Sequence, residues 1–372
     1  EFCKERRGMS KNRKAFEQRP QIGRRQFLRG GVSLGVGVAA PLHSSRARGR
    51  QRADLSAPDD LIWGVNGHPV TAYPGVPLND QLGLVRDLGF THYRINLRGD
   101  GSPDYLEDIL RAADSWDVTI LPILIGAELD LDKTAVNEIK AANFEIGKSM
   151  AARFKGRVPI WELGNELENY AIIHPCEIRD DGTQYPCEWG PAGGVGALEY
   201  FGPRWAKVSA VLSGLAEGVA AADKKALRAM GTAGFGHLGA FERMKNDGIP
   251  WEITVWHDYE TIRESYLETL KDYGRPIWVT EFNAGGGGDQ SHEENARQLV
   301  ERIGYYRKMR TDYNVTAAFP YELLDEPYWG DHFEARMGLV SLKPHPEHEN
   351  GWTIDALKPQ GVGVRDAILY GA

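Results

Sequence analysis

Short apolar runs alternate with longer segments of mixed polarity from residue 61 to residue 370. The runs have the length and continuous apolar character of strands buried on both faces, and the longer segments repeat apolar residues at helical spacing. Gly89 and Pro103 stand where one helix is expected to end and the next to begin. The predicted strands cover residues 61–66, 91–97, 118–125, 157–165, 226–233, 251–257, 276–282 and 315–321. The predicted helices cover residues 78–88, 103–116, 134–154, 203–222, 238–246, 261–273, 291–310 and 363–370.

This alternation predicts an α/β fold, a (β/α)8 TIM barrel, as a single domain over residues 53–372. An open doubly wound sheet is the main alternative. Such a sheet usually has a glycine-rich turn after its first strand, and residues 66–69, Asn-Gly-His-Pro, are not one. Two stretches are expected to lack regular structure: a long loop over residues 168–202, and about thirty residues after the eighth strand.

Polar and ionisable side chains follow the C-terminal ends of the predicted strands, which is where barrels of this kind carry their chemistry. The fourth strand ends on Asn165 and Glu166, and the seventh ends on Glu281. Two carboxylates at one rim are what cleavage of a glycosidic bond requires. The other polar residues at these ends are Asn66, His68, Arg94, Asn96, His257, Tyr259, Asn283, Tyr321 and Glu322.

With these residues the chain resembles the clan A retaining glycoside hydrolases, which share this barrel. Leu-Gly-Asn-Glu at residues 163–166 is similar to the clan's acid/base motif, and Val-Thr-Glu-Phe-Asn at 279–283 is similar to its nucleophile motif. Arg94 matches an arginine beside the nucleophile, and residues 257–259, His-Asp-Tyr, match a motif of family 5.

Within the clan, the resemblance is strongest to family 39-type bacterial members involved with exopolysaccharides, carried by residues 64–68, 321–326 and 357–359. The chain also departs from the clan's pattern. Tyr321 stands where a tryptophan is expected after the eighth strand, with Trp329 as a possible substitute, and Leu167 replaces the usual proline after Asn-Glu. The third strand end lacks the histidine of family 5.

The resemblance implies that Glu281 is the nucleophile and Glu166 the acid/base of a double displacement. Their carboxyl groups would then lie about 5–5.5 Å apart, the spacing of retaining enzymes. Arg94 and either Tyr259 or His257 are expected to keep Glu281 ionised, and Asn165 to bind the sugar 2-hydroxyl. We expect His68, Asn283, Tyr321 and Trp329 to bind substrate or support these groups.

Plainer interpretations stay open for several of these residues. Glu162 lies near the same strand end and could be the acid in place of Glu166, although an asparagine directly before the glutamate favours Glu166. Glu281 could be only a structural partner of Arg94, and His257 an ordinary core histidine. Most tryptophans are expected in the core, and those in rim loops, Trp189, Trp329 and Trp352, are candidates for stacking on sugars.

Two rival functions use the same fold. One is a carbohydrate-binding barrel without turnover, which the presence of both glutamates disfavours. The other is a metal-dependent hydrolase, which would need a His-x-His motif at the first strand end, where the chain offers only His68. No cofactor motif is present in the sequence, so neither a cofactor nor a metal is expected.

The charge of the chain is divided unevenly. Residues 1–52 hold fourteen basic and three acidic side chains, so the remainder carries 30 basic and 49 acidic ones. A body this acidic repels nucleic acids and anionic membranes, which are therefore not expected as partners. An oligo- or polysaccharide is the expected partner, and the oligomeric state is open.

The N-terminal region, residues 1–52, is expected to be a disordered export segment. Arg24 and Arg25 precede an apolar run over residues 30–42, which resembles a twin-arginine signal and is shorter than the roughly 20 apolar residues of a membrane span. The chain is therefore predicted to reach the periplasm or the cell exterior without stable membrane insertion.

Cys176 and Cys187 are the two cysteines outside this segment. An even pair in an exported protein favours a disulfide. A metal site is the alternative, but only His174 lies nearby as a further ligand.

Overall fold

The computed structural model describes residues 61–69, 71–97, 103–260 and 262–371. Within this part of the chain, eight strands form a closed barrel in which each strand pairs with its neighbour in sequence and β8 returns to β1. All these pairs are parallel. The predicted barrel is confirmed, and the open doubly wound sheet is wrong. The strands are β1 (Ile62–Gly67), β2 (His92–Leu97), β3 (Thr119–Leu124), β4 (Ile160–Leu163), β5 (Leu227–Thr232), β6 (Ile253–Asp258), β7 (Ile277–Phe282) and β8 (Val315–Pro320).

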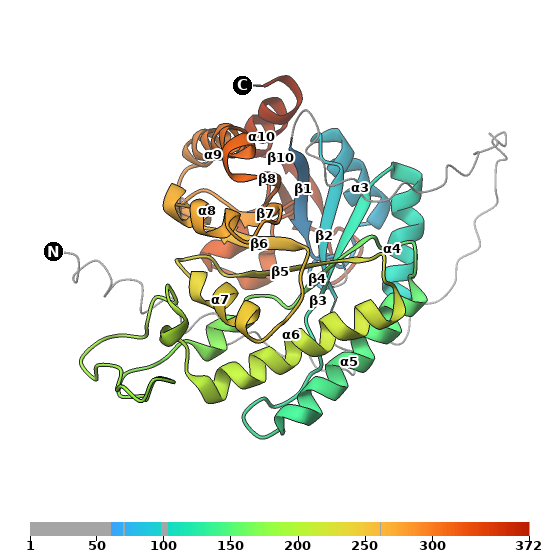
Figure 1. Ribbon diagram of the computed structural model, residues 1–372. Helices are drawn as coiled ribbons and strands as arrows, with labels where there is room; N and C mark the ends of the chain where they lie inside the picture. The colour runs from blue at the N-terminus through green and yellow to red at the C-terminus, as the bar shows by residue number, and fades with distance from the viewer. Residues whose placement is uncertain (1–60, 70, 98–102, 261, 372) are drawn as a thin grey trace. The chain divides into compact units, whose positions relative to one another are not determined.

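Helices follow the strands and lie outside the barrel (Figure 1). Two long helices, α5 and α6, pack side by side, and Gly218 allows the close approach because a Cβ there would lie 2.2 Å from the carbonyl oxygen of Phe144. The helices are α3 (Leu78–Asp87), α4 (Pro103–Trp116), α5 (Val136–Arg153), α6 (Gly202–Ala222), α7 (Leu238–Asn246), α8 (Glu264–Lys271), α9 (His292–Tyr313) and α10 (Pro359–Tyr370).

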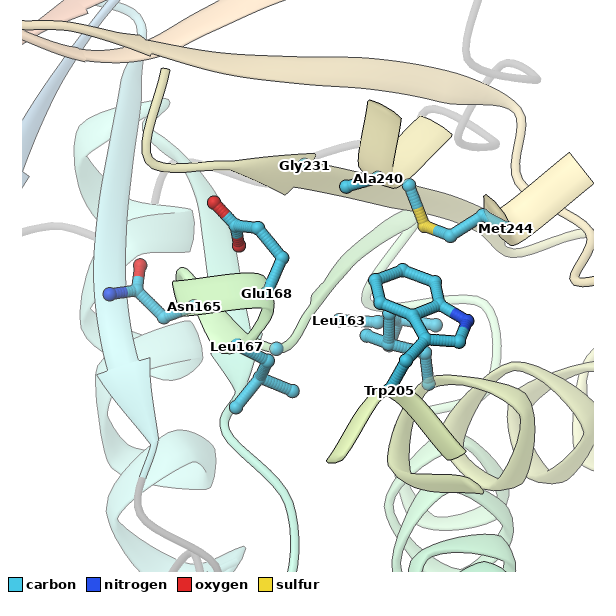
Figure 2. Close-up of a pocket in the computed structure, with 10 residues that line it drawn as sticks. Leu163, Asn165, Leu167, Glu168, Trp205, Gly231, Ala240 and Met244 are labelled. Atoms are coloured by element: carbon cyan, nitrogen blue, oxygen red, sulfur yellow. The ribbon is translucent and has the colours of Figure 1, made fainter. Parts of the chain in front are cut away.

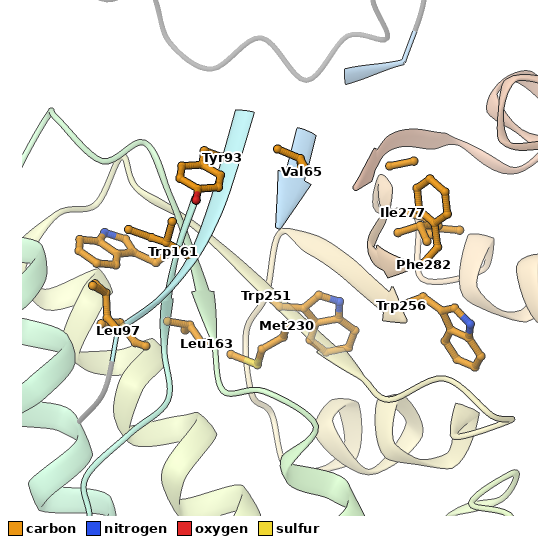
Figure 3. Close-up of a cluster of buried hydrophobic side chains, with 14 of the residues drawn as sticks. Val65, Tyr93, Leu97, Trp161, Leu163, Met230, Trp251, Trp256, Ile277 and Phe282 are labelled. Atoms are coloured by element: carbon orange, nitrogen blue, oxygen red, sulfur yellow. The ribbon is translucent and has the colours of Figure 1, made fainter. Parts of the chain in front are cut away.

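Two apolar cores hold these layers together. A small one fills the barrel interior, where Trp278 and Phe319 are fully buried and Gly64 leaves room for the Phe319 ring. The larger core lies between strands and helices and includes Trp161, Trp256 and Phe282, which Figure 3 shows as sticks. Because apolar side chains fill the barrel interior, the polar side chains near the strand ends gather at the rim.

The segment after β8 differs from the prediction. It contains an antiparallel hairpin, β9 (Val340–Pro344) with β10 (Trp352–Leu357), where no regular structure was expected. A bridge between Leu324 and Val340 joins the hairpin to the chain that leaves β8. The hairpin therefore fixes the loop that carries residues 321–326.

The predicted disulfide is present: Cys176 and Cys187 are joined in the long loop between β4 and α6. No helix among residues 61–371 that the structure describes is long and apolar enough to cross a membrane. The predicted signal of residues 1–52, with Arg24 and Arg25, lies outside the described residues.

Candidate active site

Arg94, from β2, is the centre of the polar groups at the rim. It is 2% exposed, and its guanidinium donates through Nε to Glu162 Oε2 at 2.8 Å and through Nη1 to Glu281 Oε1 at 2.6 Å. Nη2 donates to Glu162 Oε1 and to Asn165 Oδ1. A charge this deeply buried is stable only when paired, and here two carboxylates from β4 and β7 share it. Burial would lower the pKa of Arg94, but both carboxylates outweigh that effect and raise it.

Glu281, near the end of β7, is held in its ionised form. Besides Arg94, the Tyr259 hydroxyl donates to its Oε2 at 2.7 Å, and His257 Nδ1 lies 3.5 Å from the same oxygen. Burial by itself would raise the pKa of Glu281. The charges of His257 and Arg94 together with the two hydrogen bonds overcome burial and bring the pKa down to about 2.

Glu166 follows β4 and faces the same histidine. His257 Nδ1 lies 2.8 Å from Glu166 Oε1, and one oxygen of Glu166 lies within 4.8 Å of one oxygen of Glu281. The backbone of Glu166 has φ 53° and ψ 32°, a left-handed conformation that costs roughly 1–2 kcal/mol for a side chain of this kind. Gly164, two residues earlier, has φ 76°, so the chain turns sharply between β4 and the following 3₁₀ helix.

His257, at the end of β6, connects the two glutamates. Its Nε2 lies 3.4 Å from Arg94 Nη2, and its Nδ1 lies 2.8 Å from Glu166 Oε1. Burial lowers the pKa of His257, but Glu281 and Glu166 raise it by more, so the net pKa is raised. The same nitrogen, Nδ1, lies 2.8 Å from Glu166 and 3.5 Å from Glu281, so His257 contacts both glutamates through one atom.

Glu162 is not placed to act as the acid. It is 2% exposed, and both of its oxygens accept hydrogen bonds from Arg94. Asn165 Oδ1 accepts from the same guanidinium at 3.0 Å, so its NH2 group is the end that can donate to a ligand. Glu162 therefore orients Arg94, and Asn165 offers a donor beside Glu166.

A second polar group lies beside this one and contains His68 and Tyr321. His68 Nε2 lies 3.1 Å from the Tyr321 hydroxyl, and the Tyr321 and Tyr259 rings meet edge to face at 6.2 Å between centroids. Two buried glutamates complete the group, because His68 Nε2 is 3.3 Å from Glu322 and 3.8 Å from Glu326. Tyr321 thus contacts the ring of Tyr259, which in turn donates to Glu281, and His68 lies behind Tyr321.

Trp329 and Asn283 contact other parts of the chain. The Trp329 indole donates to Glu326 Oε2 at 3.1 Å, which places it on the second polar group. Asn283 Nδ2 donates to the backbone carbonyls of Tyr321 and Met337, so this residue ties β7 to the chain after β8. Neither residue has a hydrogen bond to Glu166 or Glu281 among those that the structure describes.

Sequence reasoning missed the roles of Asn66 and Glu326. Asn66 Oδ1 accepts from Arg94 Nη1 at 2.7 Å, and its amide donates to the carbonyl of Thr280 at 2.8 Å, so it links β1, β2 and β7. Its position at a strand end was the only signal. Glu326 is 1% exposed and accepts from Tyr328 and Trp329, and nothing in its local sequence distinguishes it from a loop glutamate.

Among the residues that the structure describes, two groups each bring three possible metal-ligand atoms within 4.8 Å of one another: Glu166, His257 and Glu281, and also His68, Glu322 and Glu326. In the first group the guanidinium of Arg94 already supplies the positive charge next to Glu281. In the second group burial and the neighbouring carboxylate of Glu326 raise the pKa of Glu322 well above its usual range. The raised pKa favours the protonated form of Glu322 in the second group, whereas Arg94 balances the charge in the first.

A small cavity lies behind the turn that carries Asn165 (Figure 2). It is bounded by Glu168 and by apolar side chains from α6 and α7, among them Trp205 and Met244, and its volume is about 10 Å3. A volume of this size holds no more than one water, so the cavity is not a site for a sugar.

Known structures share this barrel. A family 1 β-glucosidase from Thermotoga maritima superposes with a TM-score of 0.59 at 13% identity, over 85% of this chain and 98% of its own. The virulence factor SghA, solved with its substrate analogue salicin, gives a TM-score of 0.58 at 13% identity, over 84% of this chain and 96% of its own. The β-glycosidase BGL167 gives 0.57 at 11%, over the same shares of the two chains.

No protein-family model matches the chain, and no curated protein matches it either. At 11–13% identity, the solved structures show that this chain has the fold of glycosidase barrels. They do not choose between families 39 and 5, so that finer resemblance stays a prediction.

Proposed function

We propose that this protein is a retaining glycoside hydrolase of clan A that cleaves a β-linked glycan by double displacement. Glu281 is the nucleophile and Glu166 the acid/base. The observation that supports the proposal is that Glu166, after β4, and Glu281, in β7, have oxygens within 4.8 Å of each other and both contact His257 Nδ1. Retaining enzymes keep their carboxyl groups about 5–5.5 Å apart and inverting enzymes about 6.5–9.5 Å, and oxygens within 4.8 Å of each other are compatible with the retaining spacing.

In the first step Glu281 Oε attacks the anomeric carbon while the protonated Glu166 gives its proton to the leaving oxygen. The C–O bond to the leaving group breaks as the ester to Glu281 forms. In the second step Glu166, now a carboxylate, takes a proton from water, and the water oxygen displaces Glu281 and restores both side chains. Two inversions at the same carbon return the original anomer.

The surrounding groups match this division of roles. Arg94 and Tyr259 keep Glu281 ionised, as a nucleophile must be, with a pKa of about 2. Asn165 presents its NH2 group beside Glu166, where it can donate to the sugar 2-hydroxyl. We propose that His68, Tyr321 and Trp329 border the same sugar from the second polar group, and that Asn283 supports the loop.

The substrate is proposed to be an extracellular or envelope polysaccharide, because the disulfide of Cys176 and Cys187 suits an oxidising compartment. Residues 1–52 are proposed as a twin-arginine export region and residues 53–372 as the hydrolase domain.

A screen of neutral β-linked polysaccharides and aryl β-glycosides tests the activity, with the anomer of the first product read by NMR. Retention of the β-anomer is expected, and an α-product would exclude double displacement. Glu166→Gln is expected to lower turnover by about 10²–10⁴-fold and Glu281→Gln to abolish it. The control Glu138→Gln, an exposed residue on α5, is expected to match the wild type.

Azide separates the two roles. In Glu281→Gly it can enter the face that the nucleophile has left and give an α-glycosyl azide, whereas in Glu166→Ala it attacks the glycosyl-enzyme and gives the β-azide. The reverse assignment of products would exchange the roles of the two residues. Binding of a glycan with no turnover of any substrate in the screen would instead indicate a carbohydrate-binding barrel.

A further inference from the structure

Glu168, two residues after Glu166, forms a buried pair with His237. His237 Nδ1 lies 2.9 Å from Glu168 Oε1, and the Ala233 N–H donates to the same oxygen at 2.6 Å. Glu168 is 3% exposed and His237 is 1% exposed. The double displacement uses neither side chain, so this pair of ionisable residues needs an explanation of its own.

Stability does not account for the choice of these residue types. Glu168 Oε2 and His237 Nε2 are both buried, and neither has a hydrogen-bond partner among the residues that the structure describes. A buried polar atom without a partner destabilises a fold, and apolar side chains of the same shape would avoid that cost. Since an apolar pair is often at least as stable as a buried ionisable one, a role for this pair is expected in the conformation that it fixes.

The turn that follows β4 is a conformation of this kind. Glu166 has φ 53° in it, and a residue with a side chain keeps such a backbone only where its surroundings impose it. Before Glu166, the Gly164 N–H donates to the carbonyl of Leu124 at 2.7 Å. After it, the hydrogen bond from Ala233 holds the side chain of Glu168. The turn is thus fixed on both sides of the proposed acid/base residue, and Glu168 supplies one of the two sides.

Packing behind this turn is incomplete. In Figure 2, Asn165 and Glu168 lie on one side of the small cavity, and Trp205 and Met244 lie on the other. Atoms that border a cavity lack packing partners on that side, so they are held less firmly than atoms in a filled core. The hydrogen bonds of Glu168 therefore matter more here than they would in a turn that apolar side chains enclose.

The loop after β5, which donates to Glu168, also borders His257. A Cβ on Gly234 would lie 1.9 Å from the carbonyl oxygen of His257, so the two backbones are in close contact. The His237 N–H donates to the carbonyl of Gly234 at 2.8 Å and closes the loop on itself. This loop therefore joins the backbone beside Glu166 to the histidine that contacts the Glu166 carboxyl group.

We propose that Glu168 and His237 are positioning residues, which hold Glu166 where it can donate its proton to the leaving group. This inference rests on the proposed function and adds to it two residues that touch no substrate. Without the pair, the turn loses the hydrogen bonds that fix its second side, and the Glu166 side chain is free to change direction. A displacement of about 1 Å in a catalytic group can lower a rate by about a hundredfold.

The test separates proton donation from the rest of catalysis through the leaving group. Dinitrophenolate departs without a proton, whereas the more basic phenolate needs one. A dinitrophenyl β-glucoside therefore reports attack by Glu281, and a phenyl β-glucoside reports attack together with donation by Glu166. Both values of kcat/KM are measured on the same sample, so their ratio does not depend on the fraction of folded protein. If the screen identifies another sugar or an oligosaccharide, its two aryl glycosides replace the glucosides.

Glu168→Ala and His237→Leu remove the contact between the two side chains. Each is expected to lower kcat/KM for the phenyl glycoside by about tenfold to a hundredfold, and that for the dinitrophenyl glycoside by less than about threefold. Glu168→Gln keeps an acceptor oxygen at the contact, and His237→Asn keeps a donor nitrogen. These two conservative variants are expected to recover most of the loss.

The matched control is Asp223→Ala, which also removes a buried carboxylate. Asp223 accepts from the N–H groups of Gly156 and Lys225, and it precedes β5, at the end of the barrel opposite the rim. Asp223→Ala is expected to lower the Tm, as Glu168→Ala does, but to leave the ratio of the two kcat/KM values at that of the wild type.

Three results would overturn the proposal in different ways. A wild-type ratio in Glu168→Ala and His237→Leu, including equal losses on both substrates, means that the pair does not act on proton donation, and the hydrolase function then stands. The same fall of the ratio in Asp223→Ala means that loss of any buried carboxylate produces the effect. If the wild type cleaves no substrate in the screen, the proposed function fails and this inference fails with it.

Discussion

Replacing Tyr259 with phenylalanine removes one hydrogen bond from Glu281 and changes little else. The Tyr259 hydroxyl is 2.7 Å from Glu281 Oε2, and the other polar contact of that oxygen within the described part of the chain is His257 Nδ1 at 3.5 Å. Arg94 still contacts the other oxygen at 2.6 Å. The change therefore measures how much one neutral donor contributes to keeping the nucleophile ionised.

The size of the effect follows from the charge of the acceptor. A hydrogen bond to a charged group contributes about 1.5–3 kcal/mol, and one pKa unit corresponds to about 1.4 kcal/mol. Losing it is therefore expected to raise the pKa of Glu281 by about one to two units from its value of about 2. Because a carboxylate with that pKa stays ionised at neutral pH, the main consequence is a loss of activity in acid.

The assay is the pH dependence of kcat/KM, whose acid limb reports the ionisation of the free enzyme. Tyr259→Phe is expected to move this limb upward by about one to two pH units. The matched control is Tyr306→Phe, which removes a hydrogen bond of 2.6 Å to the buried carboxylate of Asp258. This control is expected to leave the limb in place, with circular dichroism confirming that all three proteins remain folded.

Superposition of the acid limbs of Tyr259→Phe and the wild type would refute the reasoning. An equal shift in Tyr306→Phe would do so as well, because the effect would then be a general loss of buried hydrogen bonding. Because His257, Glu166 and Glu281 interact, the apparent pKa of the acid limb belongs to the whole group. The test therefore uses the difference in that pKa between variants.

Three other predictions concern stability and export. The pKa of Glu281 is depressed from 4.5 to about 2, so its ionised form contributes about 3 kcal/mol to the free energy of unfolding above pH 4.5, and this contribution is lost as the pH falls toward 2. Urea unfolding is expected to show the acid-dependent loss in the wild type and not in Glu281→Gln. Parallel pH profiles of the two proteins would contradict the prediction. The double variant Cys176→Ser with Cys187→Ser opens a loop with a sequence separation of 11 and is expected to lose about 3 kcal/mol of unfolding free energy relative to the oxidised wild type. Urea unfolding measures this loss, and the reduced wild type is the control that is expected to match the variant; a variant as stable as the oxidised wild type would contradict it. Replacing Arg24 and Arg25 by lysine is expected to keep a reporter fused to residues 1–52 inside the cell. The control, with lysine at Arg46 and Arg48, is expected to be exported. Export of the first variant would exclude the twin-arginine interpretation.

The missed hairpin shows where local sequence reasoning fails. Strands β9 and β10 are separated by residues 345–351, so no two-residue turn marks them, and they are mostly half-buried or exposed. The sequence of this segment therefore has neither an apolar run nor a turn signal, and the two strands form only because they pair with each other in the folded chain.

The sequence alone determined the barrel and the rim. Periodicity is a local property, and parallel strands point the same way, so residues at strand ends such as Glu166 and Glu281 had to meet at one face. Only the tertiary structure decided how they are connected: Arg94 donates to carboxylates 68 and 187 residues away, and His257 Nδ1 contacts both Glu166 and Glu281. Strand order brings side chains to the same rim, but barrel closure and packing set the distances that decide which of them touch.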